Sequence, residues 1–137
     1  LDLYVANANS ANVLYVNNGS GGLTLAAGVA TDAGRAVGVA FGDVDGDGDL
    51  DLYVANWGSA ANVLYMNDGS GGFTVAAGVA ADIGDGRGVA FGDVDNDGDL
   101  DLYVANFGNP NVLYVNDGSG GFTVAAGVAA DAGFADV

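Results

Sequence analysis

The chain of 137 residues contains no cysteine and no histidine, and all 18 of its acidic residues are aspartate. Its only cations are Arg35 and Arg87, because lysine is absent as well. Disulfide bonds are therefore excluded. The usual pairs of nucleophile and base are unavailable without His, Cys, Lys and Glu, so we expect no enzyme. A formal charge of −16 disfavours nucleic acid as a partner, because phosphates are bound by lysine and arginine.

Long hydrophobic runs are also missing. No stretch approaches the roughly 20 apolar residues of a membrane span, so we expect no membrane insertion. No signal peptide is visible, and the chain begins with Leu1 rather than methionine. We therefore expect a processed chain or the ordered segment of a longer one. Half of the residues are hydrophobic, which argues against a disordered acidic tail and for a folded protein.

Two nine-residue segments hold ten of the eighteen aspartates. In each segment an aspartate stands at every second position, and glycine stands at the sixth. Carboxylates a few ångströms apart repel one another unless a cation lies between them. Ligands that are all oxygens, on a loop with a sharp glycine turn, are typical of calcium. We therefore predict two Ca²⁺ sites, at Asp43, Asp45, Asp47, Asp49 and Asp51 and at Asp93, Asp95, Asp97, Asp99 and Asp101.

The spacing also predicts what each position contributes. In the familiar twelve-residue calcium loop, side chains at positions one, three and five and the carbonyl at position seven face the ion. In the first segment these are Asp43, Asp45, Asp47 and the carbonyl of Asp49. The usual closing glutamate at position twelve is missing, so we assign closure to the aspartate at position nine. The alternative interpretation is a surface turn rich in Asp and Gly, which two near-identical copies make less favourable.

Internal repeats organise the whole chain. The segment 1–7 recurs at 50–56 and at 100–106, with a period of 49–50 residues that is typical of propeller blades or stacked arrays. The chain thus holds about 2.75 repeats. We divide it into residues 1–49, which lack the start of their first calcium loop, residues 50–99, and residues 100–137, which are truncated.

Each repeat predicts four short strands. In the best example the strands are expected at residues 88–94, 100–106, 111–116 and 122–126, with a glycine-rich hairpin turn at 117–121. These strands are apolar on both faces, so both faces of each sheet must be covered. We therefore predict an all-β fold of tandem four-stranded antiparallel blades of β-propeller type, with open ends.

Two segments resemble a known family. Phe41-Gly42-Asp43-Val44-Asp45-Gly46-Asp47-Gly48-Asp49-Leu50-Asp51-Leu52 and its counterpart at 91–102 are similar to the FG-GAP/VCBS repeat, the calcium-binding blade of integrin α-subunit-like β-propellers. The resemblance implies metal ligands at Asp43, Asp45, Asp47 and Asp51 and at Asp93, Asp95, Asp97 and Asp101. It also implies a secreted or surface protein, commonly bacterial. Family propellers close with about seven blades, whereas this chain has fewer than three repeats.

The two ends align with interrupted calcium loops. Asp2 matches the last aspartate of a loop, and Asp136 matches the first, so we interpret both as half-sites. Open blade edges favour further association. We expect the partners to be copies of this chain or further repeats, which would form a closed ring or a head-to-tail filament.

Composition and repeats together favour a non-enzymatic, calcium-stabilised structural or adhesive protein. A structural calcium site of weak affinity argues for an extracellular or cell-surface location. The alternative is a lectin-like module that binds glycans, because Trp57 and Phe107 stand at equivalent positions where an aromatic ring stacks on a sugar or packs on a neighbouring blade. We expect Arg35 and Arg87 to form structural ion pairs. Asn18 begins a glycosylation sequon in an exposed turn.

Overall fold

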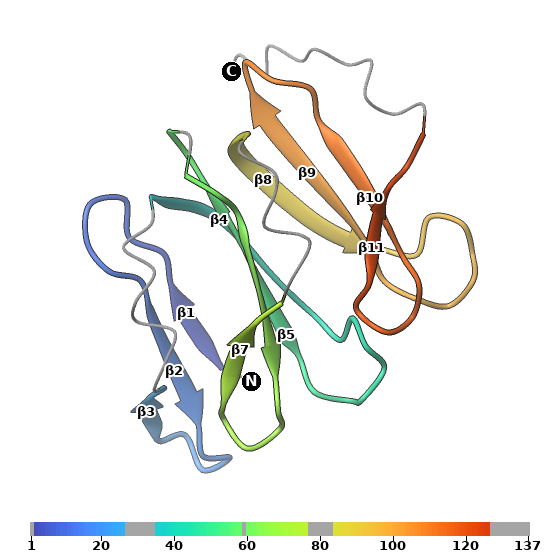
Figure 1. Cartoon of the computed structure of the whole chain (residues 1–137). Coiled ribbons are helices and arrows are strands. Elements are labelled where there is room, and N and C mark those ends of the chain that lie inside the picture. Colours follow the sequence, from blue (N-terminus) through green and yellow to red (C-terminus); the bar gives the residue numbers. More distant parts are fainter. Residues whose placement is uncertain (1, 27–34, 59, 77–83, 127–137) are drawn as a thin grey trace.

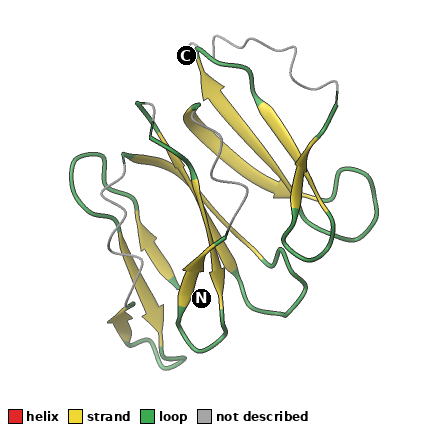
Figure 2. Cartoon of the chain, viewed as in Figure 1, coloured by secondary structure: helices red, strands yellow, loops and turns green. Residues whose placement is uncertain are grey.

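The chain folds into three antiparallel sheets that follow one another along the sequence. The computed structural model describes residues 2–26, 35–58, 60–76 and 84–126, which contain eleven strands and no helix. Figure 1 shows the sheets side by side in chain order, and Figure 2 shows that strands and loops make up all of this part. The prediction of an all-β fold of tandem blades is therefore confirmed. None of the described segments forms a helix that could cross a membrane.

Every sheet is a meander in which neighbouring strands are also consecutive in sequence. The first sheet consists of β1 (Leu3–Val5), β2 (Val13–Asn17) and β3 (Leu23–Leu25). The second consists of β4 (Ala36–Gly42), β5 (Asp51–Asn56), β6 (Val63–Asn67) and β7 (Phe73–Val75). The third consists of β8 (Asp85–Gly92), β9 (Asp101–Phe107), β10 (Val112–Asn116) and β11 (Phe122–Val124). The four strands expected in the third sheet are all present, and their ends differ from the prediction by up to three residues.

The sheets and the predicted repeats are out of phase. Each four-stranded sheet takes its first strand, β4 or β8, from the end of one predicted repeat and its other three strands from the next. The aspartate-rich loops therefore lie inside a sheet, between its first and second strands, and do not link one sheet to the next. The period of the repeat is unaffected, because β4–β7 and β8–β11 have the same order and the same shift of register in the first strand.

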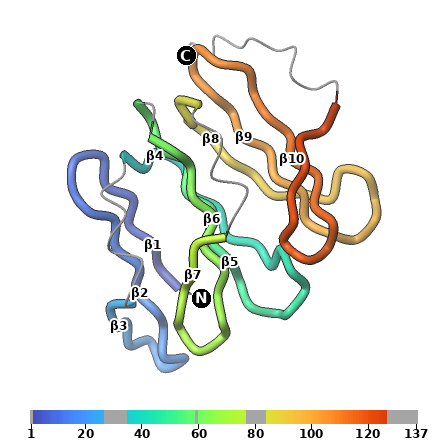
Figure 3. Tube along the Cα trace, viewed as in Figure 1, coloured from blue at the N-terminus to red at the C-terminus, as the bar shows by residue number. Residues whose placement is uncertain are grey.

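The hydrophobic core lies between the sheets, in two separate layers. Alternate residues of a strand point to opposite faces, so Leu52 and Tyr53 of β5 enter different layers. Leu52 packs in the layer shared with Tyr4 and Leu14 of the first sheet, whereas Tyr53 packs in the layer shared with Leu102 of the third. The tube in Figure 3 shows this stacking of successive sheets. Strands that are apolar on both faces are thus explained by a sheet with a neighbour on each side.

Candidate metal centre

The two aspartate-rich loops have the same position and the same backbone shape. Residues 43–50 join β4 to β5, and residues 93–100 join β8 to β9. Position four adopts a left-handed conformation in both, with φ of 74° at Gly46 and 65° at Asn96. Position six does the same at Gly48 and Gly98, with φ of 95° and 99°. Glycine and asparagine tolerate this conformation better than other residues, so the exchange of Gly46 for Asn96 leaves the loop shape unchanged.

The first aspartate of each loop holds the turn together from inside. Asp43 accepts hydrogen bonds from the backbone N–H of Gly46 at 2.9 Å and of Gly48 at 3.0 Å. Asp93 accepts the matching bonds from Asn96 at 2.7 Å and from Gly98 at 3.2 Å. These bonds wrap the backbone around the carboxylate at position one, and the following aspartates are thereby brought toward it.

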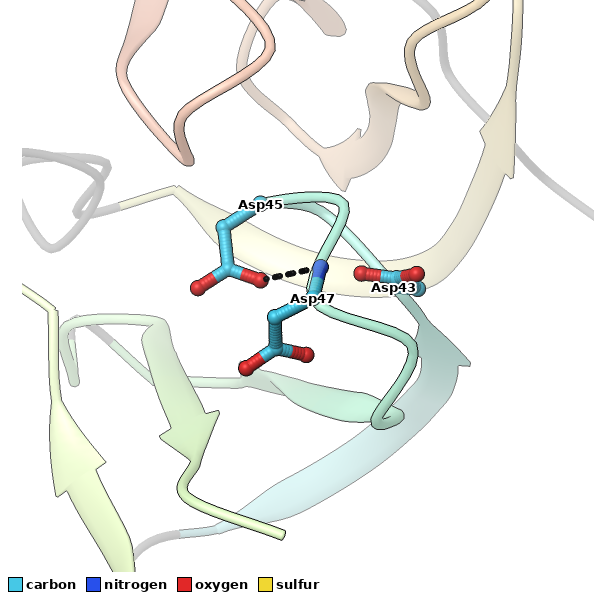
Figure 4. Close-up of side chains that lie close together, drawn as sticks. All are labelled: Asp43, Asp45 and Asp47. Carbon is cyan, nitrogen blue, oxygen red and sulfur yellow. Dashed lines mark hydrogen bonds between the residues drawn. The ribbon is translucent and has the colours of Figure 1, made fainter.

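Three carboxylates converge in each loop. Oxygen atoms of Asp43, Asp45 and Asp47 lie within 4.8 Å of one another, and so do oxygen atoms of Asp93, Asp95 and Asp101. Figure 4 shows the carboxylates of Asp45 and Asp47 extending from the same side of the first loop. Calcium binds oxygen at about 2.3–2.6 Å, so two ligands on opposite sides of one ion lie about 5 Å apart. The spacing and the donor set therefore fit calcium.

The aspartate at position nine has a structural role that the sequence analysis missed. Asp51 and Asp101 are almost completely buried. Asp51 accepts hydrogen bonds from the N–H of Val44 at 2.9 Å and of Asn67 at 2.8 Å, and Asp101 accepts the equivalent bonds at 2.8 and 3.0 Å. Each carboxylate thus ties its loop to the third strand of the sheet. A signal was available, because an aspartate between two leucines at the start of an apolar strand is expected to be buried.

Position nine also distinguishes the two clusters. Asp101 belongs to the second cluster, whereas Asp51 is not among the three residues that converge in the first. Of the predicted half-sites, Asp2 takes the same structural role, because it accepts a hydrogen bond from the N–H of Asn17 at 2.9 Å. Asp136 lies outside the described residues.

The side chain at position seven points away from the cluster. A Cβ added to Gly69 would overlap the carboxylate of Asp49, and one added to Gly118 would overlap that of Asp99. Both carboxylates therefore lie against the following hairpin turn. This orientation is compatible with the predicted use of the main-chain carbonyl at position seven. Metal binding by the carbonyls of Asp49 and Asp99 remains a prediction.

Electrostatic repulsion is visible in the acidity of the loop carboxyls. Desolvation raises the pKa of Asp95, and the charges of Asp97 and Asp101 raise it further. Burial is also the main reason that the pKa of Asp51 is raised, with smaller contributions from Asp45 and Asp47. The charges of Asp97 and Asp101 thus make Asp95 harder to ionise, and those of Asp45 and Asp47 have the same effect on Asp51. A divalent cation among these oxygens would remove that penalty.

The two arginines stack on the aromatic rings to which the lectin-like alternative assigned a sugar. The guanidinium carbon of Arg35 lies 4.6 Å from the centre of the Trp57 ring, and that of Arg87 lies 5.1 Å from the centre of the Phe107 ring. These are cation–π contacts. The ion pairs expected for the arginines are not found among the described residues, and stacking on an aromatic ring replaces them.

Comparison with known families agrees with the geometry. The sequence model of the FG-GAP-like repeat matches three overlapping segments, residues 1–54, 44–104 and 93–137. These matches cover the whole chain, so the chain belongs to the FG-GAP-like repeat family, and the resemblance to the FG-GAP repeat is confirmed. No curated protein matches the chain at a significant level.

Proposed function

We propose that this FG-GAP-like repeat chain is a non-enzymatic structural or adhesive module, stabilised by calcium and acting outside the cell. The observation that carries the proposal is the convergence of three carboxylates within 4.8 Å in each of two loops. Family membership supports a repeat protein of the propeller type rather than a catalyst. A formal charge of −16 with only two arginines makes a cation from the solvent the natural counterion.

Calcium would act by joining strands within each sheet. Asp43, Asp45 and Asp47 would hold the ion in the first loop, and Asp93, Asp95 and Asp101 in the second. The ion would supply two positive charges, in the second loop to a site where desolvation and the charges of Asp97 and Asp101 raise the pKa of Asp95. Since each loop connects the first two strands of its sheet, the strands would be held together more firmly when the ion is bound.

An extracellular location follows from the expected affinity. These loops have nine residues and no closing glutamate, and calcium modules that work at about 0.1–1 mM are filled outside the cell but not in the cytosol. Partners are proposed to be copies of this chain or further repeats of the same kind. The lectin-like alternative, in which the chain binds glycans, gains no support from Trp57 and Phe107, because an arginine stacks on each ring.

Calcium titration of the 137-residue chain tests the proposal. Isothermal titration calorimetry should show binding, and thermal unfolding should occur at a higher temperature in calcium than in EDTA. Asp45→Asn removes one converging carboxylate and should weaken binding at the first loop. Asp68→Asn is the matched control, since it makes the same change of charge in a hairpin turn outside both loops. Equal melting temperatures in calcium and in EDTA would contradict the proposal.

A further inference from the structure

Successive sheets pack through two different faces. We define the forward face of a sheet as the side that bears Tyr53 and Leu64 in the second sheet, and the rear face as the side that bears Leu52 and Val54. The forward face of the first sheet packs on the rear face of the second, and the forward face of the second packs on the rear face of the third. One pair of complementary faces is thus used twice within the chain.

The two remaining faces are bare among the described residues. On the forward face of the third sheet Tyr103 is 36% and Val94 is 55% exposed, whereas their counterparts Tyr53 and Val44 are 0% and 1% exposed. On the rear face of the first sheet Leu3 is 47% and Val5 is 37% exposed, although the matching Leu52 and Val54 are completely buried. The described sheets therefore present both halves of the internal interface, one on the first sheet and one on the third.

A specific socket on the forward face shows the same contrast. In the second sheet a Cβ on Gly42 would lie 2.8 Å from a ring carbon of Phe91 and 3.1 Å from Leu100, so the third sheet fills that place. At the equivalent Gly92 nothing lies within 4 Å. A cavity of about 170 Å³ opens there instead, lined by Phe91, Val94, Tyr103 and Leu113 among others. Only this absence of a neighbouring sheet distinguishes Gly92 from Gly42.

The neighbouring sheet also reaches the calcium loop. The side-chain amide of Asn116, in the third sheet, donates a hydrogen bond of 2.7 Å to the carbonyl of Val44, in the first loop. Asn17 stands at the same register position in the first sheet, because the N–H of each asparagine bonds the aspartate at position nine. The carbonyl of Val94 is the counterpart of Val44 in the second loop. A sheet docked on the forward face would bring its own asparagine to this carbonyl.

We propose that the forward face of the third sheet binds the rear face of the first sheet of a second copy of this chain. Docking puts Asn17 of the second copy on the carbonyl of Val94 and so adds a hydrogen bond to the Asp93–Asp101 loop. Calcium binding at that loop and docking then strengthen each other by the same factor. This coupling, though not the docking itself, rests on the proposed function. Because each copy carries a charge of −16, calcium also favours docking by reducing repulsion.

The contact is heterologous, and this gives a sharp test with the full chain in calcium. Leu3→Asp places a charge on the rear face and leaves the forward face intact. Gly92→Leu fills the socket, where an added Cβ would have no heavy atom within 4 Å apart from its chain neighbours. Val75→Asp is the control for charge and exposure, since Val75 is 62% exposed on the outer strand β7 and lies on no proposed interface.

Sedimentation velocity and light scattering should show association of the wild type and of Val75→Asp. Leu3→Asp and Gly92→Leu should each remain monomeric. An equimolar mixture of these two variants should form dimers that grow no further. The intact forward face of Leu3→Asp binds the intact rear face of Gly92→Leu, and the faces that remain free in this dimer are the two altered ones. The mass in the mixture should therefore roughly double, which a symmetric contact between like faces would not produce.

A wild type that stays monomeric in calcium at every concentration would overturn the proposal. A mixture without dimers would overturn it as well. Calcium binding is read separately by calorimetry on Leu3→Asp. Binding without association overturns the docking alone, whereas association without binding overturns the proposed function and leaves the docking standing.

Discussion

The side-chain amide of Asn116 donates a 2.7 Å hydrogen bond to the carbonyl oxygen of Val44, which lies 72 residues earlier in the chain. This bond joins the third sheet to the first aspartate-rich loop. Val44 is 1% exposed, whereas Val94 at the same position of the second loop is 55% exposed. Two loops of nearly identical sequence are thus placed in different surroundings.

Loss of this bond should weaken the first loop. In Asn116→Ala the buried carbonyl of Val44 loses its donor, a change that typically costs about 1–3 kcal/mol. We expect lower thermal stability and weaker calcium binding at the first loop, measured by calorimetry in the presence of an Asp95→Asn background that impairs the second. Asn67→Ala is the control, because the Asn67 amide bonds the carbonyl of Leu50 within its own sheet. An equal loss of calcium affinity in both variants would contradict the role of Asn116.

Asp51 should stabilise the fold even without calcium. Asp51→Asn replaces one buried acceptor by a donor that faces the N–H of Val44 or of Asn67. The free energy of unfolding should fall by about 1–3 kcal/mol in EDTA, measured by urea unfolding. Asp47→Asn should not destabilise the chain in EDTA, since Asp47 is exposed and its removal relieves repulsion. If Asp51→Asn lost no stability in EDTA, position nine would act only as a metal ligand.

The conformation at position four should decide which substitutions the first loop accepts. Gly46 has φ of 74°, and a left-handed conformation costs most L-residues about 1–2 kcal/mol. Gly46→Ala should therefore lower the stability by that amount. Gly46→Asn should be tolerated, because Asn96 already holds φ of 65° at the equivalent place. Thermal unfolding of the two variants measures the difference, and a more stable Gly46→Ala would contradict it.

Acid should affect the calcium-free chain in two opposite ways. The pKa of Asp95 is raised above 3.8 by desolvation and by Asp97, so its ionisation opposes folding at neutral pH. Lowering the pH toward 3.8 protonates Asp95, removes the cost of its ionisation and should increase stability. The pKa of Asp68 is lowered below 3.8 by hydrogen bonds from Gly72 and Ser70, so its contribution is present above 3.8 and is lost as the pH falls further. Stability in EDTA should therefore pass through a maximum near this pH.

A natural control for the loss of stability below pH 3.8 is present in the first sheet. Asn18 occupies the place of Asp68 and accepts the same turn bonds, from Ser20 at 2.9 Å and from Gly22 at 3.0 Å, without titrating. Hydrogen bonds from Ser119 and Gly121 likewise lower the pKa of Asp117. The double variant Asp68→Asn, Asp117→Asn should fold normally and lose less stability below pH 3.8 than the wild type. If the double variant lost as much stability below pH 3.8 as the wild type, these two turns would be ruled out as the cause of that loss.

Short-range features were predictable from sequence. Alternating aspartates with glycine at position six specified the loop, because the left-handed residues and the bonds to Asp43 are local. The 49–50-residue period and the apolar strands specified tandem antiparallel sheets. The division into repeats was less accessible, since self-similarity defines the length of a repeat but not where a sheet begins. The four strands between residues 88 and 126 were expected together, but the divisions after residues 49 and 99 separate β4 and β8 from the strands with which they pair.

The sequence by itself determined the all-β repeat, the family and the two clusters of carboxylates, because each depends on residues close together in the chain. Only the tertiary structure decided that position nine is buried under two backbone N–H groups, that the arginines stack on aromatic rings, and that one loop is covered while the other is bare. These features depend on contacts between segments far apart in sequence. Val44 and Val94 have the same neighbours along the chain, and only the presence of another sheet separates their environments.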